Sequence, residues 1–221
     1  MHILLIGASG MVGQAALLAC QRDDRITQIT ALVRHPLGTT TSKVREILCP
    51  DLFAISTIAD QLGSPDACLF CAGVSSVGMS EPQYRHVTYD LTIAVAEVLS
   101  TLNPSMRFLY VSGAGTDSTE RGRSMWARVK GATENALCRL PFAAVALFRP
   151  GYIQPLHGVS SKVGWYNAIY TAISPLYPLI QRVVPKYAAD TDTLGRAMIA
   201  AVQPGTPTAV YESVDINRIG A

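Results

Sequence analysis

The chain has 221 residues, of which 49% are hydrophobic and 15% charged, and its formal net charge is +2. This length and apolar content are typical of one globular domain with a well-buried core, and they exclude a disordered chain. The small charge and the lack of a basic run argue against direct binding of nucleic acid.

The chain opens on a short apolar run, Ile-Leu-Leu-Ile at residues 3–6, which predicts a buried strand. Gly7, Gly10 and Gly13 follow, and residues 14–19 are good helix formers. Here Gly7 permits a tight turn, Gly10 lets the backbone approach a pyrophosphate, and Gly13 lets the helix lie close to the strand. Free N–H groups and the helix dipole attract the phosphates. We therefore expect a dinucleotide to contact Gly7, Ala8, Ser9, Gly10, Met11 and Val12.

The G-x-x-G-x-x-G spacing of this turn differs from the G-x-G-x-x-G of the common dinucleotide fingerprint. It resembles the N-terminal turn of extended and atypical members of the short-chain dehydrogenase superfamily. The resemblance implies a Rossmann fold with a bound nicotinamide dinucleotide.

The second predicted strand, residues 29–33, ends at Arg34. A dinucleotide site needs a group for the adenosine ribose about twenty residues beyond the glycine turn. An acidic residue there would repel a 2′-phosphate, whereas Arg34 can pair with one through two donors. The position therefore favours NADP over NAD. A solvated arginine at a strand end is the alternative.

Residues 44–48 are a plausible third strand, and residues 67–72 a fourth. The resemblance implies that Asp51 and Leu52, just beyond the third strand, lie beside the adenine. The small pair Ala72 and Gly73 would let the cofactor pass close to the end of the fourth strand. The alternative is a glycine that only ends the strand.

The five cysteines, at 20, 49, 68, 71 and 138, form no metal-ligand pattern, and no metal site is expected. Cys68 and Cys71 have redox-motif spacing, but positions three apart on a strand face opposite sides. We expect buried free thiols in a reducing compartment and a cytoplasmic protein. Residues 17–20 superficially resemble a lipoprotein cleavage site, which we reject because no Lys or Arg precedes it.

The later elements continue to alternate between strand and helix. A helix capped by Ser80 should run to Leu102 and bury Val87, Leu91, Ala94 or Val95, and Val98. The remaining predicted elements are a strand over 108–111, a helix over 124–140, a strand over 143–148, a helix over 191–201 and a strand over 208–211. This order predicts an α/β fold, a doubly wound parallel sheet of the Rossmann type with helices on both faces.

We expect one NAD(P)-binding domain over residues 1–221, to which residues 151–205 contribute a small substrate or lid region. Residues 164–181 carry no charge but include two prolines, so they favour a cover over an apolar cleft, or a subunit contact, over a membrane span.

The resemblance also implies where chemistry occurs. The superfamily uses a Tyr-x-x-x-Lys helix turn and a serine at the end of the preceding strand. Tyrosine transfers the substrate proton, lysine binds the nicotinamide ribose, and serine binds the substrate oxygen. Ser112 and Lys130 match that pattern and are the predicted catalytic and cofactor-binding residues, but Trp126 stands where the tyrosine belongs. An indole cannot act as that proton shuttle.

Over nearly the whole chain the sequence is similar to atypical short-chain dehydrogenases of the NmrA-like and Tat-interacting-protein-like type. The matching stretches include residues 7–13, 31–34, 111–112, 129–131 and 148–152. The resemblance adds cofactor contacts at Gly151, Tyr152 and Ile153. Biliverdin and flavin reductases of similar fold transfer hydride without the tyrosine.

The leading hypothesis is an NADP(H)-binding oxidoreductase that transfers hydride to an unknown small organic substrate. The rival is a non-catalytic NADP(H) sensor that binds a protein partner, and a homodimer is also compatible with the sequence. A third possibility is that another tyrosine, such as Tyr89 or Tyr152, replaces the missing hydroxyl.

Overall fold

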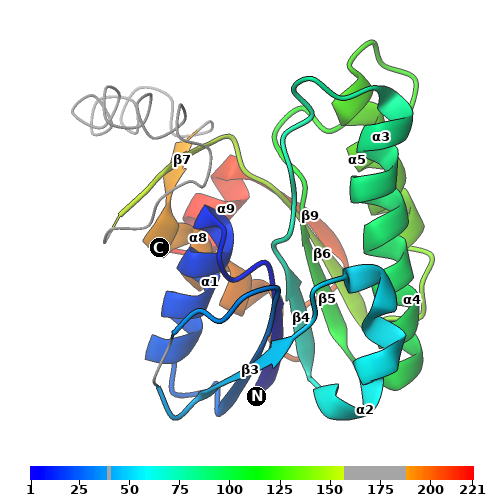
Figure 1. Ribbon diagram of the computed structural model, residues 1–221. Coiled ribbons are helices and arrows are strands. Elements are labelled where there is room, and N and C mark those ends of the chain that lie inside the picture. Colours follow the sequence, from blue (N-terminus) through cyan, green and yellow to red (C-terminus); the bar gives the residue numbers. More distant parts are fainter. Residues whose placement is uncertain (39–40, 157–187) are drawn as a thin grey trace.

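The computed structural model describes residues 1–38, 41–156 and 188–221. At its centre is a parallel sheet of seven strands in the order β3-β2-β1-β4-β5-β6-β9 (Figure 1). The strands are β1 (His2–Ile6), β2 (Gln28–Val33), β3 (Val44–Leu48), β4 (Ala67–Phe70), β5 (Arg107–Val111), β6 (Ala144–Arg149) and β9 (Ala209–Glu212). The predicted doubly wound α/β fold is confirmed.

Helices cover both faces of the sheet (Figure 1). One face carries α1 (Met11–Arg22), α8 (Thr191–Ala201) and α9 (Ser213–Ile219). The other carries α2 (Ala59–Leu62), α3 (Glu81–Arg85), α4 (Leu91–Leu102) and α5 (Met125–Leu137). A 3₁₀ segment, η1 (Leu52–Ile58), precedes α2, and a π-helical turn, η2 (His86–Asp90), joins α3 to α4.

Strand β1 shows why continuous apolar runs form this sheet. Ile3 and Leu5 point into the core under α1 and α8, whereas Leu4 and Ile6 point into the core under α4. All four side chains have no exposed surface. Because side chains alternate along a strand and helices cover both faces, the positions of such a strand are mostly apolar.

Most predicted boundaries agree with the structure to within two residues. The fourth strand, however, ends at Phe70 rather than residue 72, and the α5 helix ends at Leu137 rather than residue 140. The helix that begins after Ser80 reaches Leu102 as predicted, although η2 interrupts its α-helical pattern. The uncharged stretch 164–181 lies outside the described residues.

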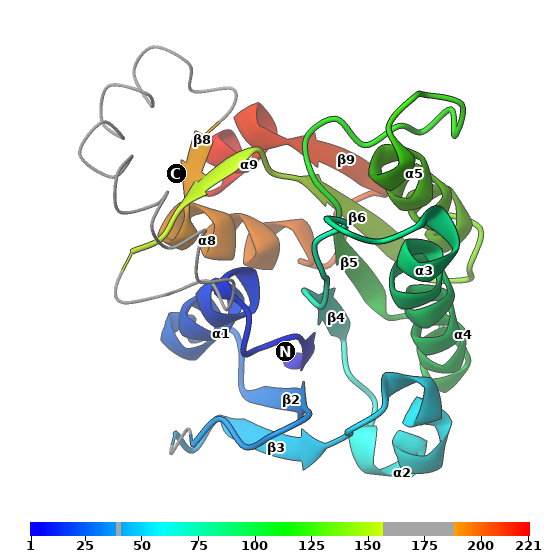
Figure 2. The same cartoon turned by 45° about the horizontal axis from the view of Figure 1, so that its top comes forward.

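Three features were missing from the sequence prediction: the η1–α2 segment, α9, and a second sheet. Strands β7 (Tyr152–Gln154) and β8 (Ala188–Asp190) pair in parallel in that second sheet. Figure 2 shows this pair beside α8 and α9, apart from the seven-stranded sheet.

The cysteines are free, as predicted. Cys68 packs into the α4-side core and Cys71 against the α1-side core, so the two thiols do face opposite sides of the sheet. Cys20, Cys49 and Cys68 are buried, but Cys71 is half-buried and Cys138 is exposed, which corrects the expectation for those two. Burial raises the pKa of the Cys20 thiol to about 12. No helix in the described ranges is long and apolar enough to cross a membrane.

Candidate functional site

A cavity of about 330 Å³ opens at the carboxyl ends of the central strands. Its walls come from the turns after β1, β2, β3 and β4, and from η1, η2 and α4. Ligands of open parallel sheets bind at this edge, where the strand order reverses, and here it reverses between β1 and β4. The lining residues are Ile6, Gly7, Ala8, Ser9, Gly10, Leu32, Val33, Arg34, Cys49, Pro50, Asp51, Leu52, Phe53, Cys71, Ala72, Gly73, Val74, Val87 and Leu91.

Two of the three glycines in the N-terminal turn are required by the fold. Gly7 has a φ of +87°, and a Cβ there would lie 2.6 Å from the backbone nitrogen of Ala72. A Cβ on Gly13 would overlap the carbonyl oxygen of Gly7, so Gly13 sets how closely α1 lies on the turn. Both restrictions are internal to the protein.

Gly10 is different, because none of the described residues would obstruct a side chain there. Its added Cβ would meet only the Gly7 carbonyl oxygen, at an ordinary contact distance of 3.5 Å. Gly10 is the N-cap of α1, and no side chain in the described part of the chain caps that helix end. The Gly10 N–H donates to the Gly7 carbonyl over 3.0 Å, so an anion such as a dinucleotide pyrophosphate would meet the N–H groups of the first turn of α1.

The second predicted contact, Arg34, is exposed at the end of β2 and lines the same cavity. Within the described residues, no salt bridge involves its guanidinium. Asp51 also lines the cavity, but its carboxylate accepts the Phe53 N–H over 3.0 Å and caps η1. Leu52 is half-buried and packs partly against the α4-side core.

The opposite wall of the cavity was not anticipated as part of the site. Val87 and Leu91 were predicted as core residues, but both are half-buried and face the cavity. Phe53 stands at the same wall, with its ring stacked 4.9 Å from that of His86. The missed lining residues are apolar side chains, which in sequence cannot be distinguished from core.

The predicted catalytic pair lies farther along the same sheet edge, beyond β5. The Lys130 ammonium donates a hydrogen bond to the backbone carbonyl of Ser112. The Ser112 hydroxyl donates to Glu134 Oε1 over 2.5 Å, and its oxygen lies 3.1 Å from the Phe148 carbonyl. The structure thus brings Ser112 and Lys130 together, as their spacing suggested. It also adds Glu134, one helical turn beyond Lys130 on α5.

Glu134 is the centre of a buried polar network. Its side chain is 2% exposed and forms a salt bridge with Arg149 at the end of β6. The Arg149 Nε lies 3.1 and 3.2 Å from the two carboxylate oxygens, and its Nη2 donates to the Ser118 hydroxyl over 2.5 Å. Burial lowers the pKa of Lys130 to about 8, and the Glu134 charge opposes that shift.

Trp126, the residue predicted to replace the tyrosine, lies at the start of α5. The indole is half-buried and lies over the turn after β5, where a Cβ on Gly115 would come 3.6 Å from Trp126 Cη2. Gly115 has a φ of +87°, so this turn depends on glycine. A donor-only indole therefore stands one helical turn before Lys130.

The two tyrosines considered as replacements are engaged elsewhere. The Tyr89 ring carries the Arg85 guanidinium 3.9 Å from its centroid. The Tyr152 hydroxyl donates to Gln154 Oε1 over 2.8 Å, and burial raises its pKa. Neither residue lines the cavity.

The other predicted cofactor contacts lie outside the cavity lining. Met11 and Val12 pack partly against the α1-side core, and Ile153 belongs to it. The Gly151 N–H donates to the Ser213 hydroxyl over 2.9 Å, at the start of α9. These positions remain predictions, as does the catalytic role of Ser112.

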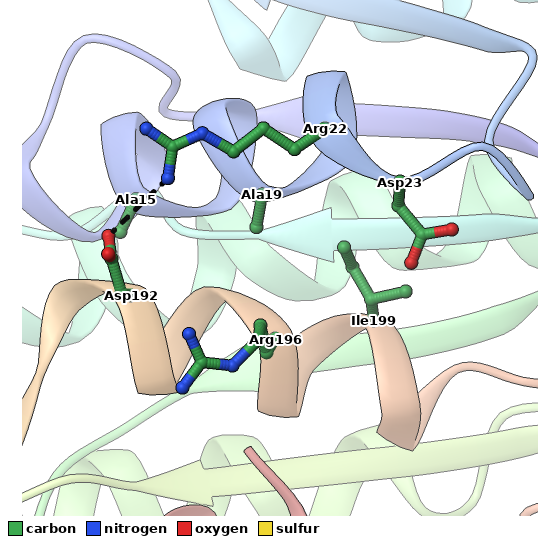
Figure 3. Close-up of a pocket in the computed structure, with 7 residues that line it drawn as sticks. All are labelled: Ala15, Ala19, Arg22, Asp23, Asp192, Arg196 and Ile199. Carbon is green, nitrogen blue, oxygen red and sulfur yellow. Dashed lines mark ion pairs between the residues drawn. The ribbon is translucent and has the colours of Figure 1, made fainter. Parts of the chain in front are cut away.

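A second hollow, of about 200 Å³, lies between α1 and α8 (Figure 3). Its floor is apolar and its rim carries two arginines and two aspartates; the lining residues are Ala15, Ala19, Arg22, Asp23, Asp192, Arg196 and Ile199. Arg22 and Asp192 approach across it to 3.9 Å. None of its residues lines the larger cavity. In the parts of the chain that the structure describes, no group of three or more His, Cys, Asp or Glu residues could hold a metal ion.

Comparison with known proteins gives a consistent picture. The model of the family described as NAD dependent epimerase/dehydratase matches residues 3–121. Leucinostatins biosynthesis cluster protein T of Purpureocillium lilacinum is 33% identical over 123 residues, which are 54% of this chain and 45% of that relative. The match therefore spans less than half of the relative's length.

Solved structures resemble the chain over most of its length. MoeE5, in complex with UDP-glucuronic acid and NAD, has a TM-score of 0.69 at 17% identity, covering 96% of this chain and 75% of its own. Glucuronic acid dehydrogenase from Chromohalobacter salexigens has a TM-score of 0.66 at 16% identity, covering 95% and 74%. At these identities the likeness shows a common fold.

Proposed function

Since the chain belongs to the NAD dependent epimerase/dehydratase family, we propose that it binds NADP(H) and is an oxidoreductase that transfers hydride to a small organic substrate. The observation that carries the proposal is the turn at Gly10. Gly10 lines the cavity at the start of α1, and among the residues with described positions no side chain caps this helix end and none would collide with a Cβ on Gly10.

Different residues along the carboxyl edge of the sheet would bind different parts of the dinucleotide. The backbone at Gly10 and the first turn of α1 would hold the pyrophosphate. Asp51, Leu52 and the apolar wall around Val87 would enclose the adenosine, and Lys130 would bind the nicotinamide ribose. A bound nicotinamide supplies the hydride.

Arg34 supports NADP rather than NAD as the cofactor. Its exposed guanidinium lines the cavity at the ribose position, where it can pair with a 2′-phosphate. The MoeE5 complex contains NAD, so cofactor preference is a point on which this chain would differ from a protein of the same fold.

Trp126 limits the chemistry. General acid–base help contributes about 10²–10⁴-fold, and an indole supplies none, while the Ser112 hydroxyl is already directed at Glu134. This arrangement suits substrates whose reduction takes its proton from solvent, such as conjugated or aromatic compounds. We also propose membership of the NmrA-like and Tat-interacting-protein-like group, with residues 151–205 contributing to a substrate or lid region.

The alternative is an NADP(H) sensor that binds a protein partner without turnover. Trp126 and the engaged Ser112 hydroxyl favour this reading, because both remove groups that catalysis by this superfamily employs.

One experiment distinguishes the two. NADPH oxidation is followed at 340 nm with quinones, flavins and aldehydes, for the wild type and for Trp126→Tyr. We expect slow turnover by the wild type and faster turnover by the variant, since a phenol restores a proton donor. Trp126→Phe is the matched control and should gain nothing. Binding of NADPH without turnover in either protein would support the sensor, and no binding would refute the proposed function.

A further inference from the structure

Ser112 is held at two points by one face of α5. Its backbone carbonyl accepts from Lys130, and its hydroxyl donates to Glu134 over 2.5 Å. Residues four apart on a helix lie on the same face, so Lys130 and Glu134 of α5 both form hydrogen bonds with Ser112, the residue that follows β5. The position of the Lys130 ammonium is thereby fixed by the protein backbone, without help from the tyrosine that Trp126 replaces.

Glu134 is held just as firmly from the other side. Arg149 reaches both of its carboxylate oxygens, at 3.1 and 3.2 Å from Nε. The Arg149 side chain is 12% exposed and that of Glu134 2%. The Arg149 Nη2 also donates to Glu134 Oε2. Such a charge-assisted, bidentate contact fixes the position of the carboxylate.

The charged and titratable groups around Lys130 can be named for each packed element. Glu134 is on its own helix, and Tyr110 lies on β5, where burial raises its pKa so that the phenol stays neutral. Arg149 comes from β6, and Glu212 at the end of β9 lies 3.4 Å from Arg149, on its exposed side. On the α3 side, Glu81 is paired with Arg128 at 2.6 Å. Of these groups, Glu134 is the one whose charge acts directly on Lys130.

We propose that Glu134 is a positioning residue: held by Arg149 and joined to Lys130 through Ser112, it provides the counter-charge that keeps the half-buried Lys130 ammonium in place for the cofactor ribose. This inference rests on the proposed function for the purpose of Lys130. The electrostatic coupling itself stands without any cofactor.

The test is a direct titration of Lys130 in the nucleotide-free protein by NMR of isotopically labelled lysine side chains. The lysines are Lys43, Lys130, Lys162 and Lys186, and the spectrum of Lys130→Arg assigns the signal. Glu134→Gln removes the counter-charge and leaves the Arg149 cation, so the titration midpoint should fall by about one pH unit. Arg149→Met leaves the Glu134 carboxylate unneutralised, so the midpoint should rise.

A purely structural network would not produce shifts of opposite sign. In the double variant Glu134→Gln/Arg149→Met, the Lys130 midpoint should fall between those of Glu134→Gln and the wild type, because both charges of the pair are removed together and Glu134 is the one that acts on Lys130. If Glu134→Gln fails to fold, the double variant, which also lacks the Glu134 charge, is titrated in its place. Glu81→Gln breaks an exposed ion pair to the same helix and is the matched control, with no expected shift.

An unchanged Lys130 midpoint in the folded variants, or movement of both single variants in one direction, would overturn the proposal. NADPH affinity, measured separately, decides the proposed function. If the variants show the opposite shifts but the protein binds no NADPH, the coupling between Glu134 and Lys130 stands and the cofactor-binding role of Lys130 is refuted.

Discussion

At the scale of single residues, the three glycines of the N-terminal turn serve different purposes although they are spaced identically. Gly7 and Gly13 solve packing problems, since a side chain at either would collide with the backbone of Ala72 or of Gly7. For Gly10, the described residues present no such collision. Its φ of −84° and ψ of 163° are available to any residue. This difference supports the proposal that Gly10 contacts a ligand.

This difference predicts opposite phenotypes for two substitutions. Gly10→Ala should change the free energy of unfolding by less than about 0.5 kcal/mol, yet weaken NADPH binding about tenfold or more, because its methyl group would occupy the pyrophosphate's approach. Gly13→Ala should destabilise the fold by about 1–3 kcal/mol or more through overlap with the Gly7 carbonyl. Urea unfolding and fluorescence titration with NADPH measure the two effects. Equal NADPH affinity for the wild type and Gly10→Ala would contradict the assignment.

At the scale of elements, the prominent contact between two helices is that of α1 with α8, on the face away from α4. Gly195 makes it possible. A Cβ there would lie 2.7 Å from both the Ala15 carbonyl oxygen and the Ala19 Cβ. The hollow of Figure 3 is the open rim of this tight crossing. The crossing holds α1, whose N-cap residue Gly10 lines the cavity.

We therefore predict that Gly195→Ala lowers the free energy of unfolding by about 1–3 kcal/mol, since either α8 or α1 must shift to admit the methyl group. Gly73→Ala is the control for stability, because nothing lies within 4 Å of its added Cβ and its φ is not positive. Thermal unfolding would reveal the difference. Similar midpoints for Gly195→Ala and the wild type would show that the helices are not packed this closely.

The elements also show which structural features can be predicted from local sequence patterns and which cannot. Runs such as residues 3–6 and 67–70 predict strands because burial on both faces leaves a local signature. The β7–β8 pair has none, since Tyr152 pairs with Ala188, far along the chain. Glu134 could have been singled out by its position four residues after Lys130. Its partners Ser112 and Arg149 become visible only when β5, β6 and α5 are placed side by side.

At the scale of the whole molecule, the parallel sheet brings the two halves of the candidate site to one edge. The glycine turn and Arg34 follow β1 and β2, whereas Ser112 and Arg149 lie at the ends of β5 and β6. All these strands run in the same direction, so their carboxyl ends share that edge. A dinucleotide laid across the switch between β1 and β4 would extend from the first half towards the second.

Such a ligand should stabilise the entire fold, and the rise in stability should depend on whether its adenosine ribose carries the 2′-phosphate that Arg34 would bind. NADPH at about 100 times its dissociation constant would add about 2.7 kcal/mol to the free energy of unfolding, a rise in Tm of about 5–10 °C for a chain of this size.

NADH at the same concentration should raise Tm less, because it lacks the 2′-phosphate that Arg34 would bind. In Arg34→Asp, NADPH should no longer raise Tm more than NADH does, and the two effects should become equal or reverse in size. The reason is that a carboxylate repels the 2′-phosphate of NADPH and accepts a hydrogen bond from the free 2′-hydroxyl of NADH. Arg121→Asp makes the same charge change at an exposed arginine outside the cavity and should preserve the preference for NADPH. An unaltered preference in Arg34→Asp would move the 2′-phosphate away from Arg34, and a wild type whose Tm responds to neither nucleotide would remove the cofactor from the site altogether.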